Sequence, residues 1–186
     1  MVSPTAPEFS TQSPETGPGP VLEIDNLTVS YSQGKQWLDA VRDFSLRIEA
    51  GQTYGLVGES GSGKSTLALA IMRYLSENGA VRGGTIKLSG RDLMSLGEAD
   101  MRHVWSNLIK LVPQNPLSSL NPSLRIGDQM TEGLFSVPSG RPAHKRVMDL
   151  LGMVNLADPE RIALNYPHQL SGGMQQRIMI AIALSG

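Results

Sequence analysis

A glycine-rich loop over residues 58–65 has the composition and spacing that phosphate binding requires. It reads Gly-Glu-Ser-Gly-Ser-Gly-Lys-Ser and matches the pattern G-x-x-x-x-G-K-[ST]. A polyphosphate needs many hydrogen-bond donors at short range, and backbone amides supply them where a chain wraps tightly around the anion. Gly58, Gly61 and Gly63 permit that wrapping, because glycine tolerates positive φ and leaves room for close approach. The loop therefore predicts a phosphate site.

A helix should begin near Lys64, so that its N-terminal partial positive charge adds to this site. Lys64 can reach the β- and γ-phosphates, the Ser65 hydroxyl can bind Mg²⁺, and Thr66 can donate to an inner phosphate. The predicted nucleotide-binding residues here are Gly58, Glu59, Ser60, Gly61, Ser62, Gly63, Lys64, Ser65 and Thr66. The alternative is a glycine- and serine-rich surface loop between a strand and a helix.

A second candidate anion site lies at residues 170–177, which read Leu-Ser-Gly-Gly-Met-Gln-Gln-Arg. Ser171 is suited to cap the helix that follows, and Gly172 and Gly173 would expose backbone N–H groups. The plainer interpretation is a capped helix start with no ligand.

The two sequences, in this order, resemble those of the ABC transporter ATPases, whose signature is LSGGQ or a close variant. Met174 replaces the commonest glutamine. The resemblance covers residues 21–186 and implies ATP and Mg²⁺ as cofactors. It also implies an α/β fold, a P-loop NTPase core with an N-terminal antiparallel β portion and an inserted helical subdomain. In this family two such domains pair head to tail, so that Ser171, Gly172 and Gly173 of one would cover the γ-phosphate held by the other.

Three further residues are interpreted through the resemblance. Tyr31, at the end of the first ordered strand, matches the aromatic residue that stacks on adenine; the alternative is a core aromatic on a strand. Gln114 matches the glutamine that ligates Mg²⁺ and reports nucleotide state, so Lys64 and Gln114 are the predicted catalytic residues and Ser65 and Gln114 the predicted metal ligands. His168 does not match the switch histidine of the family and is interpreted as a loop residue.

Residues 113–122 and 166–170 look like those of importers of dipeptides, oligopeptides and nickel chelates. The resemblance implies an ATP-hydrolysing subunit that energises uptake of such a solute at the cytoplasmic face of the inner membrane. Its implied partners are a second ATPase subunit, identical or paralogous, and integral membrane permease subunits. A solute-binding protein would act indirectly.

The family pattern continues beyond these residues with an apolar strand that ends in Asp-Glu and, later, a switch histidine. The sequence therefore predicts a fold that is incomplete at its C-terminus. We expect residues 1–186 alone to bind nucleotide weakly and to hydrolyse it negligibly. The alternative function is a truncated nucleotide-binding module without catalysis. A soluble ABC ATPase that acts on DNA or ribosomes is a third hypothesis, and a small-molecule kinase does not explain residues 170–177.

Composition narrows these functions. The 186 residues include no cysteine, which excludes disulfides and thiolate zinc sites, and the formal net charge is −1. A neutral chain lacks the basic footprint of a nucleic-acid binder, so no nucleic-acid partner is expected. No apolar run approaches the roughly 18 residues of a membrane span.

The elements that must position the motifs follow from hydrophobic periodicity. Residues 1–20, rich in proline, serine and threonine, predict a disordered tail, and 21–186 a partial ABC ATPase domain. Its expected parts are a nucleotide-binding core at 21–113, a helical subdomain at 114–170 and a signature helix at 171–186. The expected strands are 22–31, 44–48, 53–57, 86–88 and 108–112. The expected helices include 64–75, 98–107, 143–151 and 174–184.

Overall fold

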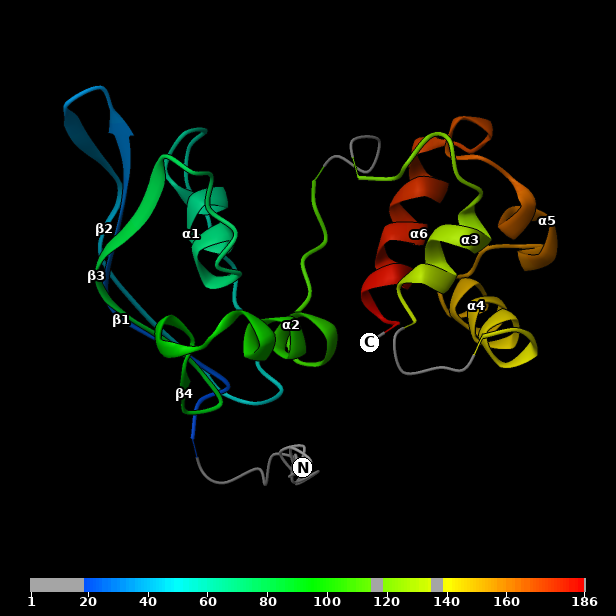
Figure 1. The fold of residues 1–186 in the computed structure, drawn as a ribbon, viewed down its shortest axis with the longest axis horizontal. Helices are drawn as coiled ribbons and strands as arrows, with labels where there is room; N and C mark the ends of the chain where they lie inside the picture. The colour runs from blue at the N-terminus through cyan, green and yellow to red at the C-terminus, as the bar shows by residue number, and fades with distance from the viewer. Residues whose placement is uncertain (1–18, 115–118, 135–138, 186) are drawn as a thin grey trace, which may run out of the picture. The chain divides into compact units, whose positions relative to one another are not determined.

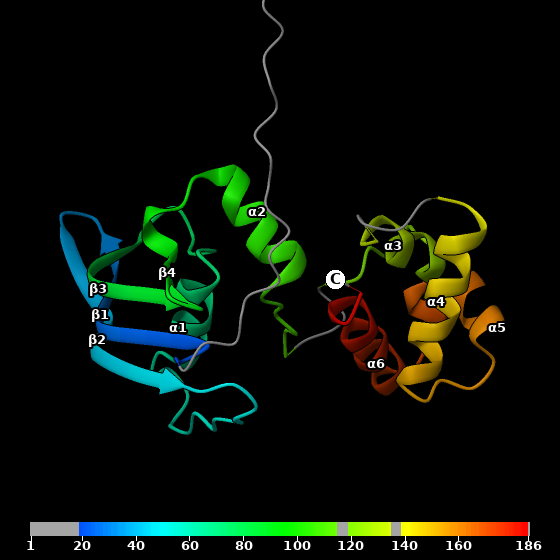
Figure 2. The ribbon, with the colours of Figure 1, turned by 90° about the horizontal axis from the view of Figure 1, so that it is seen from below.

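Four strands of the N-terminal part of the chain pair into one antiparallel sheet. They are β1 (Leu22–Gln33), β2 (Gln36–Ile48), β3 (Gly79–Leu88) and β4 (Arg91–Asp92), in the order β2-β1-β3-β4. Figure 2 shows β2, β1 and β3 side by side. This sheet confirms the predicted antiparallel β portion, although β2 and β3 both begin earlier than the alternation of apolar residues predicts.

The computed structural model describes residues 19–114, 119–134 and 139–185. The chain divides into two compact units, residues 1–97 and 98–186, each of which has its own packing. Most of the predicted tail lies outside the described residues. The subdivision into core, helical subdomain and signature helix stays a prediction.

The sheet is buried on one face. Ile24, Leu27 and Val29 of β1 and Ile86 of β3 are each 1% exposed or less. Helix α1 (Lys64–Ile71) contacts β1 and β2, and it contributes the buried residue Leu67. Removing such an apolar side chain from water stabilises the fold by about 1.5–3 kcal/mol. The sheet therefore holds in place the helix that begins at Lys64, the lysine of the glycine-rich loop at residues 58–65, which is called the phosphate loop below.

Helix α1 ends four residues before the predicted end at 75. Arg73 has a left-handed conformation with φ 51°, and the amide of Tyr74 donates to the carbonyl of Leu69 at 2.8 Å. The Arg73 amide donates to the Ala70 carbonyl at 3.0 Å, which completes a Schellman ending. The Arg73 guanidinium donates to the carbonyls of Leu93 and Leu96. Leu93 begins the 3₁₀ segment η1 (Leu93–Ser95), and Leu96 directly follows it. The apolar periodicity could not reveal this stop, because arginine is not a usual residue at such an ending.

Two predicted strands are absent: residues 53–57 and 108–112 form no strand. Both were predicted from their apolar content, and both instead expose apolar side chains, with Val57 90% and Leu111 41% exposed. A strand requires a ladder of backbone hydrogen bonds to a neighbour. Neither segment belongs to the one sheet formed by the described residues.

Helices make up the second unit. Helix α2 (Glu98–Asn107) has the predicted bounds, and α3 (Ile126–Glu132), α4 (Arg141–Met153), α5 (Pro159–Leu164), η3 (Pro167–Gln169) and α6 (Gly172–Ala183) follow. Figure 1 shows α3, α4, α5 and α6 gathered in one bundle. They enclose a cluster of buried apolar side chains: Leu120, Ile126, Met130, Leu134, Ala143, Val147, Leu150, Leu151, Leu156, Ile162, Ala163, Leu170, Ile178 and Ala181. Across the described ranges, no helix has the length and apolar character needed to span a membrane.

Candidate functional site: a phosphate loop and a second helix N-terminus

The phosphate loop has the backbone that its glycines predict. Gly61 and Gly63 have φ of 82° and 86°, values in the left-handed region that L side chains rarely adopt. The Ser62 amide donates to the Glu59 carbonyl at 3.2 Å, which closes a turn within the loop. Gly63 is the residue directly before α1, and no side chain accepts a hydrogen bond at that helix start. The N-terminus of α1 therefore lies at the end of the loop and has no side-chain cap.

Lys64 folds back over this loop. Its Nζ donates to the carbonyls of Gly58 at 2.9 Å and Glu59 at 2.6 Å, and to the Ser62 hydroxyl at 3.2 Å. The ammonium is thus held by neutral oxygens with no carboxylate partner among the described residues. A phosphate oxygen carries more negative charge than a carbonyl and forms the stronger, charge-assisted bond with a lysine. The geometry suits transfer of the Lys64 ammonium from the loop carbonyls to an anion.

A cavity of about 320 Å³ adjoins the loop, lined by Ala40, Val41, Arg42, Phe44, Leu56, Val57, Gly58, Ser62, Gly63, Lys64 and Leu67. Four of these residues belong to β2 and four to the phosphate loop. The sequence does not reveal the β2 residues of this lining, because their position depends on packing between segments about 20 residues apart. The only signal was the break in apolar alternation between residues 38 and 44.

Tyr31 is not among the residues that line this cavity. It is half-buried at the end of β1, and a Cβ built on Gly79 would lie 2.8 Å from its ring. Ser65 is exposed and Thr66 half-buried on the first turn of α1. Glu59 and Ser60 are exposed in the loop.

The second candidate site lies at the start of α6, in the other unit. The Ser171 hydroxyl accepts a hydrogen bond from the Met174 amide at 3.4 Å, as expected for a cap. Gly172 and Gly173 are exposed, and a Cβ on either would meet nothing within 4 Å. The start of α6 is therefore open to a ligand.

A buried glutamine, which the sequence does not mark as buried, holds the segment that precedes α6. Gln175 is 2% exposed, and its amide nitrogen donates to the carbonyls of Pro167 at 2.8 Å and Leu170 at 3.1 Å. These bonds fix the segment before Ser171 against α6. A glutamine in a run of polar residues gives no sequence signal of burial.

Two other predicted residues lie in the second unit. Gln114 is exposed, directly before residues outside the described ranges, and belongs to a different unit from Ser65. His168 lies in η3, with its ring stacked on that of Tyr166 at 5.7 Å between centroids. Within the described ranges, no group of three or more His, Asp or Glu side chains could hold a metal ion.

The sequence matches a known protein family over most of its length. The family described as ABC transporter matches residues 41–186. The chain belongs to the ABC transporter family. Both the phosphate loop and residues 170–177 lie within the matched range.

Relatives in the ABC transporter family are similar along most of this chain. An ATP-binding protein of Brucella abortus (strain 2308), provisionally named for peptide import, is 41% identical over 169 residues, which cover 90% of this chain and 51% of the relative. The oligopeptide transport ATP-binding protein AppD of Bacillus subtilis (strain 168) is 44% identical over 168 residues, which cover 89% and 51%. The chain thus spans about half the length of these relatives.

The fold is similar to that of a solved ABC cassette. The dimeric ATP-binding cassette MJ0796, in a post-hydrolysis state bound to ADP and Pi, superposes with a TM-score of 0.77 at 28% identity. The match covers 88% of this chain and 69% of the cassette. This similarity confirms the predicted fold class.

Proposed function

We propose that the chain is the ATP-binding part of an ABC importer, which hydrolyses ATP to energise uptake of peptides or a related solute such as a nickel chelate. The observation that carries the proposal is the phosphate loop, with two left-handed glycines, an uncapped start of α1 and Lys64 without a carboxylate partner among the described residues. The names of the Brucella and Bacillus relatives, which refer to peptide import and oligopeptide transport, support peptide import.

In this proposal the backbone amides of residues 58–66 hold the phosphates, and Lys64 releases the loop carbonyls to bind the β- and γ-phosphates. The exposed Ser65 hydroxyl fits Mg²⁺, because magnesium prefers oxygen ligands and keeps much of its shell as water and phosphate oxygens. When bound, Mg²⁺ would neutralise charge that develops on the phosphates. Gln114 is proposed as its second protein ligand and Tyr31 as the stacking partner of adenine.

The start of α6 is proposed to act on a nucleotide held by another subunit. Ser171, Gly172 and Gly173 would cover the γ-phosphate on the phosphate loop of a second ATPase subunit, identical or paralogous. The dimeric state of the MJ0796 cassette supports such pairing. Permease subunits would hold the pair peripherally at the cytoplasmic face of the inner membrane, with a solute-binding protein acting indirectly.

A second candidate function for these residues is nucleotide binding without turnover. The observation that favours it is the lining of the cavity beside the phosphate loop, which includes no aspartate or glutamate among the described residues. Hydrolysis requires a group that orients the attacking water. Release of inorganic phosphate separates the two functions, since only the first predicts steady-state turnover in the importer.

The test is calorimetric titration of the chain with ATP and Mg²⁺. The proposal predicts saturable binding that Lys64→Ala weakens at least about tenfold, because a charge-assisted bond is lost. Lys35→Ala, which removes an exposed lysine of the β1–β2 turn in the same unit, is the matched control. Equal affinity of wild type and Lys64→Ala would contradict the proposal. In cells, the same substitution in the intact importer should abolish uptake of a labelled oligopeptide.

A further inference from the structure

Strand β2 carries a bulge that touches the phosphate loop. Val29 pairs with Val41 and the next residue of β1, Ser30, pairs with Asp39, so Ala40 is the extra residue in the ladder. A Cβ built on Gly63 would lie closer than 3.0 Å to the Ala40 carbonyl oxygen and 3.3 Å from Val41 Cγ2. The backbone of the bulge therefore packs directly against Gly63, the residue that precedes α1.

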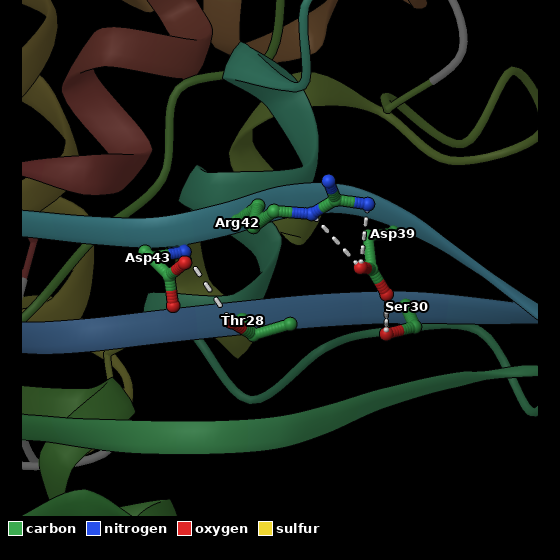
Figure 3. Close-up of polar contacts among 5 residues, drawn as sticks. All are labelled: Thr28, Ser30, Asp39, Arg42 and Asp43. Atoms are coloured by element: carbon green, nitrogen blue, oxygen red, sulfur yellow. Dashed lines mark hydrogen bonds and ion pairs between the residues drawn. The ribbon is translucent and has the colours of Figure 1, made fainter.

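A polar cluster spans this bulge (Figure 3). The Ser30 hydroxyl, which belongs to a residue only 1% exposed, donates to Asp39 Oδ1 at 2.8 Å. Arg42 donates from Nε to Asp39 Oδ2 at 3.1 Å, and its Nη2 lies 3.0 Å from the same oxygen. The Asp39 carboxylate thus links the residue before the bulge both to Ser30 of β1 and to Arg42, two positions after Ala40.

The side chain of Asp43, the residue after Arg42 in β2, makes none of the contacts of this cluster. The Asp43 amide donates to the Thr28 hydroxyl at 3.3 Å, and this bond uses the Asp43 backbone rather than its carboxylate. Asp43 also has φ 47°, a conformation that asparagine adopts as readily as aspartate. Asp43→Asn therefore removes an equal charge from the same strand without touching the cluster.

We propose that Asp39 is a positioning residue for nucleotide binding, which holds the Ala40 bulge so that the Ala40 carbonyl confines Gly63 to its phosphate-binding conformation. This inference rests on the proposed function of the phosphate loop. Asp39 acts through the bulge and does not itself touch the nucleotide. Ser30 orients its carboxylate from the buried side, and Arg42 holds it from the solvent side.

The decisive readout is the amide resonance of Gly63 in a ¹⁵N–¹H correlation spectrum of the nucleotide-free chain. Asp39→Ala should shift this resonance and weaken ATP binding about tenfold, within the range expected of residues that act through a neighbour. Asp39→Asn retains an acceptor for Ser30 and loses the ion pair with Arg42, so its effects should be smaller. Asp43→Asn should change neither quantity.

Several outcomes would overturn the inference. The inference is wrong if Asp39→Ala leaves the Gly63 resonance unchanged. This holds whether or not the melting temperature falls, because a residue with a merely structural role changes only the melting temperature. Equal effects of Asp39→Ala and Asp43→Asn would also overturn it, because the loss of a negative charge from β2, rather than the loss of the cluster, would then explain both. If Asp39→Ala does not fold, Asp39→Asn, which keeps an acceptor for Ser30 and loses the ion pair with Arg42, should still shift the Gly63 resonance, by a smaller amount. Failure of the wild type to bind ATP would refute the proposed function but leave the Gly63 test intact.

Discussion

Gly63→Ala should destabilise the chain by more than any other glycine substitution in the phosphate loop. Alanine in a left-handed conformation is disfavoured by about 1–2 kcal/mol. At Gly63 the new methyl would also meet the Ala40 carbonyl closer than 3.0 Å, where backbone must move. Overpacking of this kind costs about 1–3 kcal/mol. The expected total is about 2–5 kcal/mol in the free energy of unfolding.

Gly61→Ala is the matched control. Gly61 has nearly the same φ, 82° against 86°, but a Cβ there meets nothing within 4 Å. It should therefore lose only the conformational part, about 1–2 kcal/mol. Urea unfolding without nucleotide, followed by circular dichroism, measures both. Equal losses for the two variants would refute the claim that the bulge at Ala40 presses on Gly63.

Three other results are expected. Gln175→Leu should reduce the free energy of unfolding by about 1–3 kcal/mol in chemical denaturation, because two carbonyls lose a buried donor, whereas the exposed Gln176→Leu should be near neutral. Ser171→Ala should cost about 0.5–1 kcal/mol in the same assay, at the low end for a cap because its hydrogen bond is long. The Ser30 hydroxyl and the Arg42 guanidinium hold the pKa of Asp39 below its ordinary 3.8. Asp39 should thus contribute fully to stability above pH 3.8, and this contribution should be lost as the pH falls through the lowered pKa. Titration of Asp39 should therefore not change the Gly63 resonance between about pH 5 and 8.

The sequence predicted the starts of α1 and α6, where local chemistry sets the backbone. Lys64 begins α1, and Ser171 caps α6, because both positions follow from glycine and capping rules that act over a few residues. The antiparallel β portion also followed from alternation. The bulge at Ala40 did not follow from alternation, because the register depends on pairing between residues 9 and 12 positions apart in the chain, Ser30 with Asp39 and Val29 with Val41.

The failures have physical causes of the same kind. Apolar runs at 53–57 and 108–112 predict buried strands, but neither segment has a ladder partner in the sheet of the described residues, and both expose apolar side chains. The end of α1 depends on Arg73, whose guanidinium binds carbonyls about 20 residues away and so supports a left-handed backbone. Gln175 acts through carbonyls on the preceding turn, which periodicity does not report.

Whether residues 58–66 hold the phosphates of ATP can be measured by following backbone amides during titration with ATP and Mg²⁺. The largest ¹⁵N–¹H shifts should occur at Gly61, Gly63, Lys64 and Ser65, and inorganic triphosphate should reproduce them. Saturable binding with these amides unmoved, or the largest shifts at another part of the chain, would contradict phosphate binding at residues 58–66.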